Sequence, residues 1–147
     1  MSKRSWFLAA MVLAGCTSGA PVLTETLVPA SGSVRLAGRP AEGVRLLFTP
    51  TGVTSGTGAF GVTDAEGKFE LVHRTQEKGI VPGEYVVTFS KFQLPGGKPI
   101  PPDTSPYMAG AKESIPAKWS DPSRKGTHNI VTVVEDGKSL DFGIPLK

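Results

Sequence analysis

The chain has 147 residues, of which 39% are hydrophobic, and a formal net charge of +3. This length suits a single domain, and no cluster of Lys and Arg of the kind that follows nucleic-acid phosphates is present. Glycine (18 residues) and proline (13 residues) are both frequent, which favours short strands and turns over long helices. We therefore expect an all-β domain without a nucleic-acid partner.

The first 15 residues have the pattern of a secretory signal peptide. Lys3 and Arg4 give a positive start, and an apolar run extends from Trp6 to Leu13. The run is too short to span a membrane, which takes about 20 apolar residues. We assign residues 1–15 to a signal peptide that is removed on export.

Cys16 follows the signal directly and is the only cysteine of the chain. The segment Leu13-Ala14-Gly15-Cys16 resembles the lipobox of bacterial lipoproteins, in which the cysteine thiol is acylated and becomes the first residue. The alternative is an ordinary signal peptide with a chance cysteine near the cleavage site. The resemblance implies lipidation at Cys16, a membrane anchor, and a place in the cell envelope: the outer membrane, its periplasmic face or the cell surface.

Residues 16–30 are predicted to form the lipidated cysteine and a flexible tether, with the domain spanning 31–147. Without Lys3 and Arg4, 14 basic residues face 13 acidic ones, so the exported chain is close to neutral. Net charge therefore indicates no strongly acidic or basic partner.

Apolar residues then alternate with polar ones in a series of short segments separated by Gly and Pro turns. Such alternation is typical of strands with one buried face, and its regular interruption is typical of an antiparallel β-sandwich. The segments span residues 34–36, 44–48, 56–64, 69–71, 85–89, 129–134 and 140–144. A single helical turn is expected near 108–112.

Residues 92–113 interrupt this pattern with five prolines. Proline lacks the N–H that a strand ladder needs, so no strand is expected to run through the segment. Structureless connections of this length are usually functional or disordered. We expect any partner contact to lie within 92–120.

Three hairpin segments resemble those of the carboxypeptidase regulatory-like domains, which have a transthyretin-like sandwich. They are the segment 31–44, the segment Thr63-Asp64-Ala65-Glu66-Gly67-Lys68-Phe69, and the segment Pro82-Gly83-Glu84-Tyr85-Val86-Val87. The segments 115–121 and 133–142 further resemble small lipoproteins of planctomycetes, which usually have tyrosine in place of Trp119. The resemblance implies a Greek-key sandwich of about seven strands.

Enzymes that share the transthyretin-like fold suggest two activities, and neither matches this chain. Intradiol dioxygenases bind iron through two tyrosines and two histidines, and the chain has Tyr85, Tyr107, His73 and His128. The closely spaced histidine pair of that family is missing, and Tyr85 has the position of a core residue. Hydroxyisourate hydrolases end in Tyr-Arg-Gly-Ser, whereas this chain ends Gly-Ile-Pro-Leu-Lys. No cofactor or metal is expected.

Serine-type catalysis requires a base held beside a nucleophile by a third group. No nucleophile-elbow sequence is present, and His73 and His128 are expected to be surface residues at the ends of strands. We predict no catalytic residues, and a small hydrolase with an unrecognised site remains an alternative.

Tyr107 lies in the proline-rich segment, Trp119 follows it, and these two are the candidate partner-binding residues. Exposed aromatic side chains can anchor a protein or stack on a sugar ring, whereas the structural alternative is that both cover one end of the sandwich. The sequence thus predicts a non-enzymatic lipoprotein that binds or scaffolds an envelope protein. A carbohydrate-binding module with a glycan partner is the alternative, and it requires both aromatic residues on one exposed platform.

Overall fold

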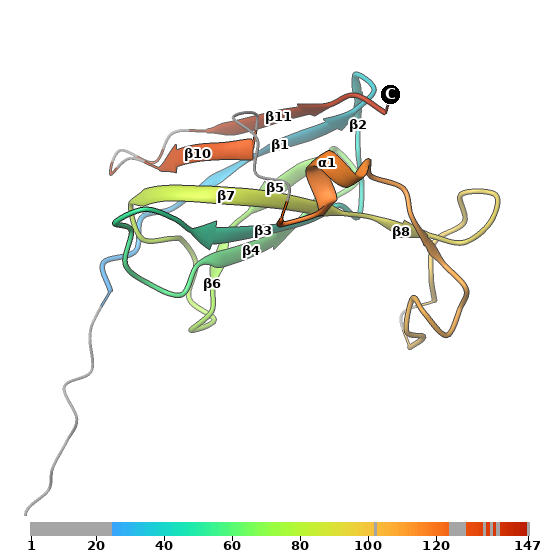
Figure 1. The fold of residues 1–147 in the computed structure, drawn as a ribbon, viewed down its shortest axis with the longest axis horizontal. Helices are drawn as coiled ribbons and strands as arrows, with labels where there is room; N and C mark the ends of the chain where they lie inside the picture. The colour runs from blue at the N-terminus through green and yellow to red at the C-terminus, as the bar shows by residue number, and fades with distance from the viewer. Residues whose placement is uncertain are drawn as a thin grey trace, which may run out of the picture.

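The computed structural model describes residues 25–101, 103–123, 129–133, 135, 137 and 139–146. Two β-sheets make up the body of the molecule, and a two-stranded ladder projects from one end (Figure 1). The first sheet contains β1 (Ser31–Leu36), β2 (Arg39–Pro40), β5 (Lys68–Glu70) and β11 (Leu140–Ile144). The second has the order β10 (Ile130–Val133), β7 (Gly83–Ser90), β3 (Arg45–Pro50), β4 (Ala59–Val62) and β6 (Val72–His73). The ladder is β8 (Phe92–Gln93) with β9 (Lys112–Glu113).

The alternation of the sequence places one face of each strand in the core. In β3, Leu46 and Phe48 are buried while their neighbours face solvent. In β7, which lies between β3 and β10, five consecutive residues from Tyr85 to Phe89 are buried.

Aromatic side chains join the two sheets across the core. Phe142 on β11 meets Phe48 and Phe89 of the opposite sheet edge to face, with ring centroids 6.4 and 5.0 Å apart. It also stacks on Phe69 of its own sheet at 6.2 Å. The two sheets therefore pack face to face, which confirms the prediction of an all-β, sandwich-like fold.

The strand inventory differs from the expected antiparallel set of about seven in two ways. The described residues contain eleven strands, several of them only two residues long, and β1 pairs with β11 in parallel. Parallel neighbours need a long connection, and nearly the whole chain separates these two strands. The alternation of polar and apolar residues shows which face of a strand is buried, but it does not show which distant strand is its neighbour or whether the two run in parallel. The sequence therefore did not predict this pairing.

Thr63 and Asp64 shape the hairpin that precedes β5. The Thr63 hydroxyl donates to the Ala41 carbonyl and accepts the Val44 N–H at 2.8 Å, which ties this hairpin to the preceding one. The Asp64 Oδ1 atom accepts the N–H groups of Glu66 and Lys68 at 3.0 and 2.8 Å. The Asp64 carboxylate is thus used in turn formation, as an Asx turn requires.

The sandwich begins before the predicted boundary at residue 31. Val28 is buried and exchanges backbone hydrogen bonds with Ile80, and the Ala30 carbonyl accepts the Leu71 N–H at 2.9 Å. Residues 25–30, assigned to the tether by sequence, therefore pack on the domain. We call them the strap. Residues 25–30 contain too few apolar residues to show a strand period, so the sequence alone predicts a linker there.

The segment 92–113 is closed at its base by β8 and β9, although no strand was expected there. The prolines lie between the two strands, so each strand keeps its ladder hydrogen bonds. The predicted helical turn near 108–112 is a series of turns, and the helix α1 lies later, at Ala117–Ser120. Within the described residues, no helix is long and apolar enough to cross a membrane.

Candidate functional site

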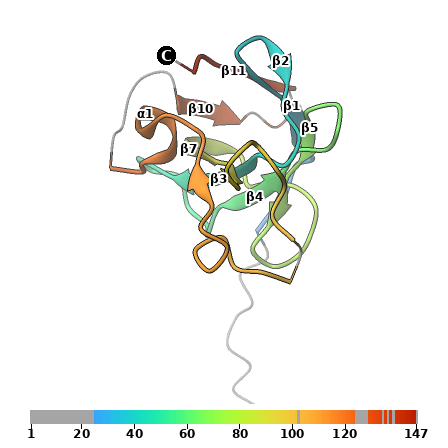
Figure 2. The same ribbon diagram turned by 90° about the vertical axis from the view of Figure 1, so that its right-hand side faces the viewer.

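Residues 91–114 form an arm that leaves the sandwich at the end of β7 (Figures 1 and 2). The arm contains β8, β9 and the proline-rich turns between them. It corresponds closely to the segment in which the sequence predicted a partner contact. A second candidate site, the His73 cluster, lies at the other end of the sandwich.

Glu113 fastens the base of the arm. Its Oε2 atom accepts the Ser90 hydroxyl at 2.6 Å, and its Oε1 atom accepts the N–H groups of Lys91 and Ile115 at 2.8 and 3.0 Å. The Ser114 hydroxyl and N–H both donate to the Lys91 carbonyl. A carboxylate that accepts three hydrogen bonds holds both limbs of the arm against the end of β7.

The outer part of the arm ends in a tight turn that exposes two large side chains. The Ala109 N–H donates to Ser105, and the Ala111 N–H donates to Pro106. Between them, Tyr107 is 83% exposed and Met108 is 86% exposed. The Tyr107 ring lies 5.9 Å from the Phe92 ring of β8, so the tip is held over the base of the arm. The arm thus presents an aromatic residue beside a flexible apolar one.

Trp119 lies apart from Tyr107, in the core. Its side chain is only 7% exposed, and its ring meets Phe89 edge to face at 5.9 Å. The two aromatic residues therefore share no exposed platform of the kind a carbohydrate-binding module requires. Trp119 lies in α1, which packs on β7, and Ile115 just before the helix is buried as well.

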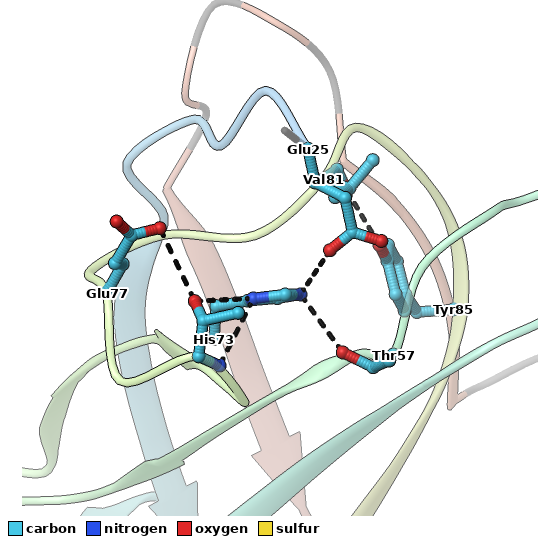
Figure 3. A network of polar contacts seen from close by, with 7 residues as sticks. Glu25, Thr57, His73, Glu77, Val81 and Tyr85 are labelled. Carbon is cyan, nitrogen blue, oxygen red and sulfur yellow. Dashed lines mark hydrogen bonds and ion pairs between the residues drawn. The ribbon is translucent and has the colours of Figure 1, made fainter. Parts of the chain in front are cut away.

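The second candidate is a polar cluster around His73 at the opposite end of β7 (Figure 3). The Nε2 atom of His73 lies 3.0 Å from the Glu25 carboxylate of the strap and 3.3 Å from the Thr57 hydroxyl. The Nδ1 atom lies 3.0 Å from the Thr75 hydroxyl, which donates onward to Glu77 at 3.4 Å. A histidine thus connects the strap to two loops of the second sheet.

His73 was expected at the surface, but its side chain is 1% exposed. The period of two explains the burial, because Phe69, Leu71 and His73 have the same parity and all face inward. The sequence predicts His73 at the end of a strand, where an exposed side chain is expected, but the alternation of buried positions extends as far as His73. Glu25 could not be found from the sequence, because it lies in the segment that was assigned to the tether.

The hydrogen-bond geometry of His73 suits a clasp better than a catalytic triad. A triad base binds its carboxylate at one ring nitrogen and its nucleophile at the other, so that a proton can pass. Here Glu25 and Thr57 lie at the same nitrogen. When Nε2–H donates to Glu25, Nε2 has no lone pair with which to deprotonate Thr57. The arrangement can hold the strap to the sandwich through the contact of His73 with Glu25.

Tyr85 lies beside this cluster. Its hydroxyl donates to the Val81 carbonyl at 2.7 Å (Figure 3). Burial raises the pKa of Tyr85 from its ordinary 10.0 to about 12, and the negative charge of Glu25 adds to the effect. Tyr85 is therefore a neutral core residue whose hydroxyl supports the loop under the strap.

Of the four residues named for an iron site, the three that the structure describes are not brought together. His73 and Tyr85 are buried at the strap end, whereas Tyr107 is exposed on the arm. His128 lies outside the described residues. Among the residues that are described, no group of three or more His, Cys, Asp and Glu side chains could hold a metal ion.

An open cleft of about 790 Å³ adjoins the strap. It is lined by strap residues, by the loops that precede β4 and β7, and by Glu135 after β10, namely Glu25, Thr26, Val28, Ser55, Gly56, Val81, Pro82 and Glu135. His73 is not among the lining residues, and Glu25 is already paired with it. The cleft therefore does not expose the imidazole to a substrate.

Comparisons with protein-family models, with curated proteins and with solved structures find no match for this chain. The predicted lipidation site, Cys16, lies outside the described residues.

Proposed function

We propose that the protein is a lipid-anchored, non-enzymatic lipoprotein of the cell envelope that binds or scaffolds a partner protein. The positive start, the apolar run and the sequence ending at Cys16 support export and acylation. An anchor of two or three acyl chains holds a protein stably at a membrane, since each buried CH₂ contributes about 0.8 kcal/mol.

One observation supports this function most directly. The strap, which continues the chain from Cys16, joins the sandwich at the start of β7, and the arm leaves it at the other end of the same strand (Figure 1). A domain held to a membrane by the strap end would present the arm on its opposite side. This is the arrangement expected of a binding module.

We further propose a Greek-key, transthyretin-like topology of the carboxypeptidase regulatory-like kind. The segments that carry the resemblance have structural roles that any such sandwich needs. Thr63 joins two hairpins, and the Phe69 and Tyr85 side chains fill the core between the sheets. Motifs with these roles support a common fold but imply no shared activity.

A small hydrolase is the second candidate, and the position of His73 beside Glu25 and Thr57 is the observation that favours it. Hydrolysis by this group requires Thr57 as nucleophile and His73 as base. Any esterase activity of the purified protein should then disappear in Thr57→Ala. We expect no activity above background in the parent or in Thr57→Ala, because Glu25 and Thr57 both lie at the Nε2 atom of His73.

Mass spectrometry of the protein from native membranes tests the proposed function. We expect a chain that begins at Cys16 and carries acyl groups on its sulfur and its amino terminus. Cys16→Ser should leave the signal uncleaved or release the protein from the membrane fraction. An intact Met1, or an unmodified sulfur at residue 16, contradicts the proposal.

A further inference from the structure

We infer that Tyr107 and Met108 form a docking knob for a folded envelope protein, whose surface has an apolar pocket with an acidic rim. The inference rests on the proposed function and specifies its partner. It follows from the exposure of the knob, its rigid support, the charges around it and its place relative to the anchor.

The exposure of the knob is unusual for two adjacent large side chains. Tyr107 and Met108 are both more than four-fifths exposed, although apolar side chains of this size are usually buried in a domain that has a core to receive them. Tyrosine and arginine are enriched among the residues that dominate binding energy at protein interfaces, and methionine adapts to irregular pockets. A tyrosine beside a methionine is therefore suited to a protein pocket.

The knob is held in position before any partner binds. One side of the Tyr107 ring is supported by Phe92, and the turn is closed by backbone hydrogen bonds from Ala109 and Ala111. Pro106 restricts the backbone immediately before Tyr107. A pre-ordered knob loses little conformational freedom on binding, so more of its contact energy contributes to affinity.

Charges on the arm define the rim of the pocket. Lys98 and Lys112 are exposed and Lys91 is half-buried, whereas the exposed acidic residue is Asp103. Glu113 is directed inward to its three hydrogen bonds. The arm thus carries more exposed positive than negative charge, which favours a partner surface with acidic residues around the pocket.

The anchored chain joins the domain at the end opposite the knob. Eight residues lie between Cys16 and Glu25, and the chain from one to the other can span about 30 Å at most. The eight residues of β7, about 27 Å long, lie between the strap end and the arm. The knob therefore lies about the length of β7 away from the point at which the anchored chain joins the domain. A glycan is less suited, because the neighbours of Tyr107 are Pro106 and Met108, which offer no side-chain hydrogen bonds to sugar hydroxyls.

Photocrosslinking in native cells tests the inference with the full-length chain. The crosslinker p-benzoylphenylalanine replaces Met108, and in a control chain it replaces Val53, which is fully exposed in the loop beside the start of β7. We expect one discrete protein adduct from position 108 and none of the same mass from position 53. The adduct protein is identified, produced separately, and its binding to the purified chain is measured.

Binding of that protein should be lowered about tenfold or more by Tyr107→Ala, whereas Tyr107→Phe should retain it because the ring is kept. Higher salt should also weaken it, since the rim contacts are charged. Thermal unfolding of these variants should match the parent, because the replaced side chain is exposed.

Four outcomes overturn the inference: no adduct from position 108, equal adducts from both positions, an adduct of lipid, glycan or a second copy of this chain, or binding that is indifferent to Tyr107→Ala. The same samples are analysed for the acyl groups on Cys16. Failure with a correctly acylated chain contradicts the docking knob alone, whereas a chain without acyl groups contradicts the proposed function.

Discussion

Gly67 and Gly38 both adopt left-handed backbone conformations, with φ values of +74° and +81°, but their surroundings differ. A Cβ atom on Gly67 would lie 2.7 Å from the Val34 carbonyl oxygen and 2.9 Å from the Ala41 nitrogen. A Cβ atom on Gly38 would meet nothing within 4 Å. The two glycines therefore separate the cost of backbone conformation from the cost of steric contact.

We expect Gly67→Ala to lower the free energy of unfolding by about 3 kcal/mol or more, and Gly38→Ala by about 1 kcal/mol. The larger value combines left-handed strain with displacement of β1 and the segment at Ala41. Urea denaturation of both variants measures the difference. Equal losses would show that the close approach at Gly67 relaxes without cost.

The raised pKa of Tyr85 predicts a loss of stability in alkali. Because the pKa is about 12 in the folded chain and about 10 in the unfolded one, the neutral hydroxyl stabilises the fold fully below pH 10. The unfolded chain loses its proton first, so stability falls between pH 10 and pH 12, by about 2 kcal/mol in total. Comparison of urea unfolding for the parent and Tyr85→Phe isolates this slope, since the two proteins differ only in this hydroxyl. Parallel curves contradict the prediction.

At the scale of elements, the arm depends on the Glu113 carboxylate. Glu113→Ala removes three hydrogen-bond acceptances at the junction of β7, β8 and β9. We expect faster amide hydrogen exchange at Lys91 and Ile115 and unchanged protection in β3, because the sandwich makes its own contacts. Asp103→Asn, at an exposed acidic residue of the same arm, is the control and should change neither. Faster amide exchange throughout β3 in Glu113→Ala would instead show that the sandwich core depends on the arm.

α1 shows how a short element acquires its place from packing. Four residues are too few to form a stable helix alone. Burial of Trp119 against Phe89 holds this turn on β7. The aromatic residue that the sequence offered as a partner contact therefore contributes to the fold instead.

At the scale of the whole molecule, the strap closes one end of the sandwich. It buries Val28 and Ala30, pairs with Ile80, and places Glu25 beside His73. A chain that begins at Ser31 should therefore be less stable than one that begins at Glu25, by about 2–4 kcal/mol from lost apolar burial and backbone hydrogen bonds. Urea unfolding of the two chains measures this difference. Equal stabilities would show that residues 25–30 contribute nothing to the fold and belong to the tether.

The sequence by itself determined the local properties of this protein. Alternation in the segments around Phe48, Phe69 and Tyr85 predicted buried strand faces, and Gly and Pro, whose backbone preferences are intrinsic, predicted the turns between strands. The signal segment and the acylation of Cys16 stay predictions from short motifs, which depend on neighbouring residues only.

Only the tertiary structure decided which distant segments meet. The parallel pairing of β1 with β11, the contact of Glu25 with His73, and the burial of Trp119 beneath α1 all join residues that no local period connects. Their positions follow from packing the apolar faces of two sheets over one core, a condition that the whole chain satisfies together. The same packing leaves Tyr107 outside, because the arm extends beyond the end of β7, where the sandwich has no core to receive it.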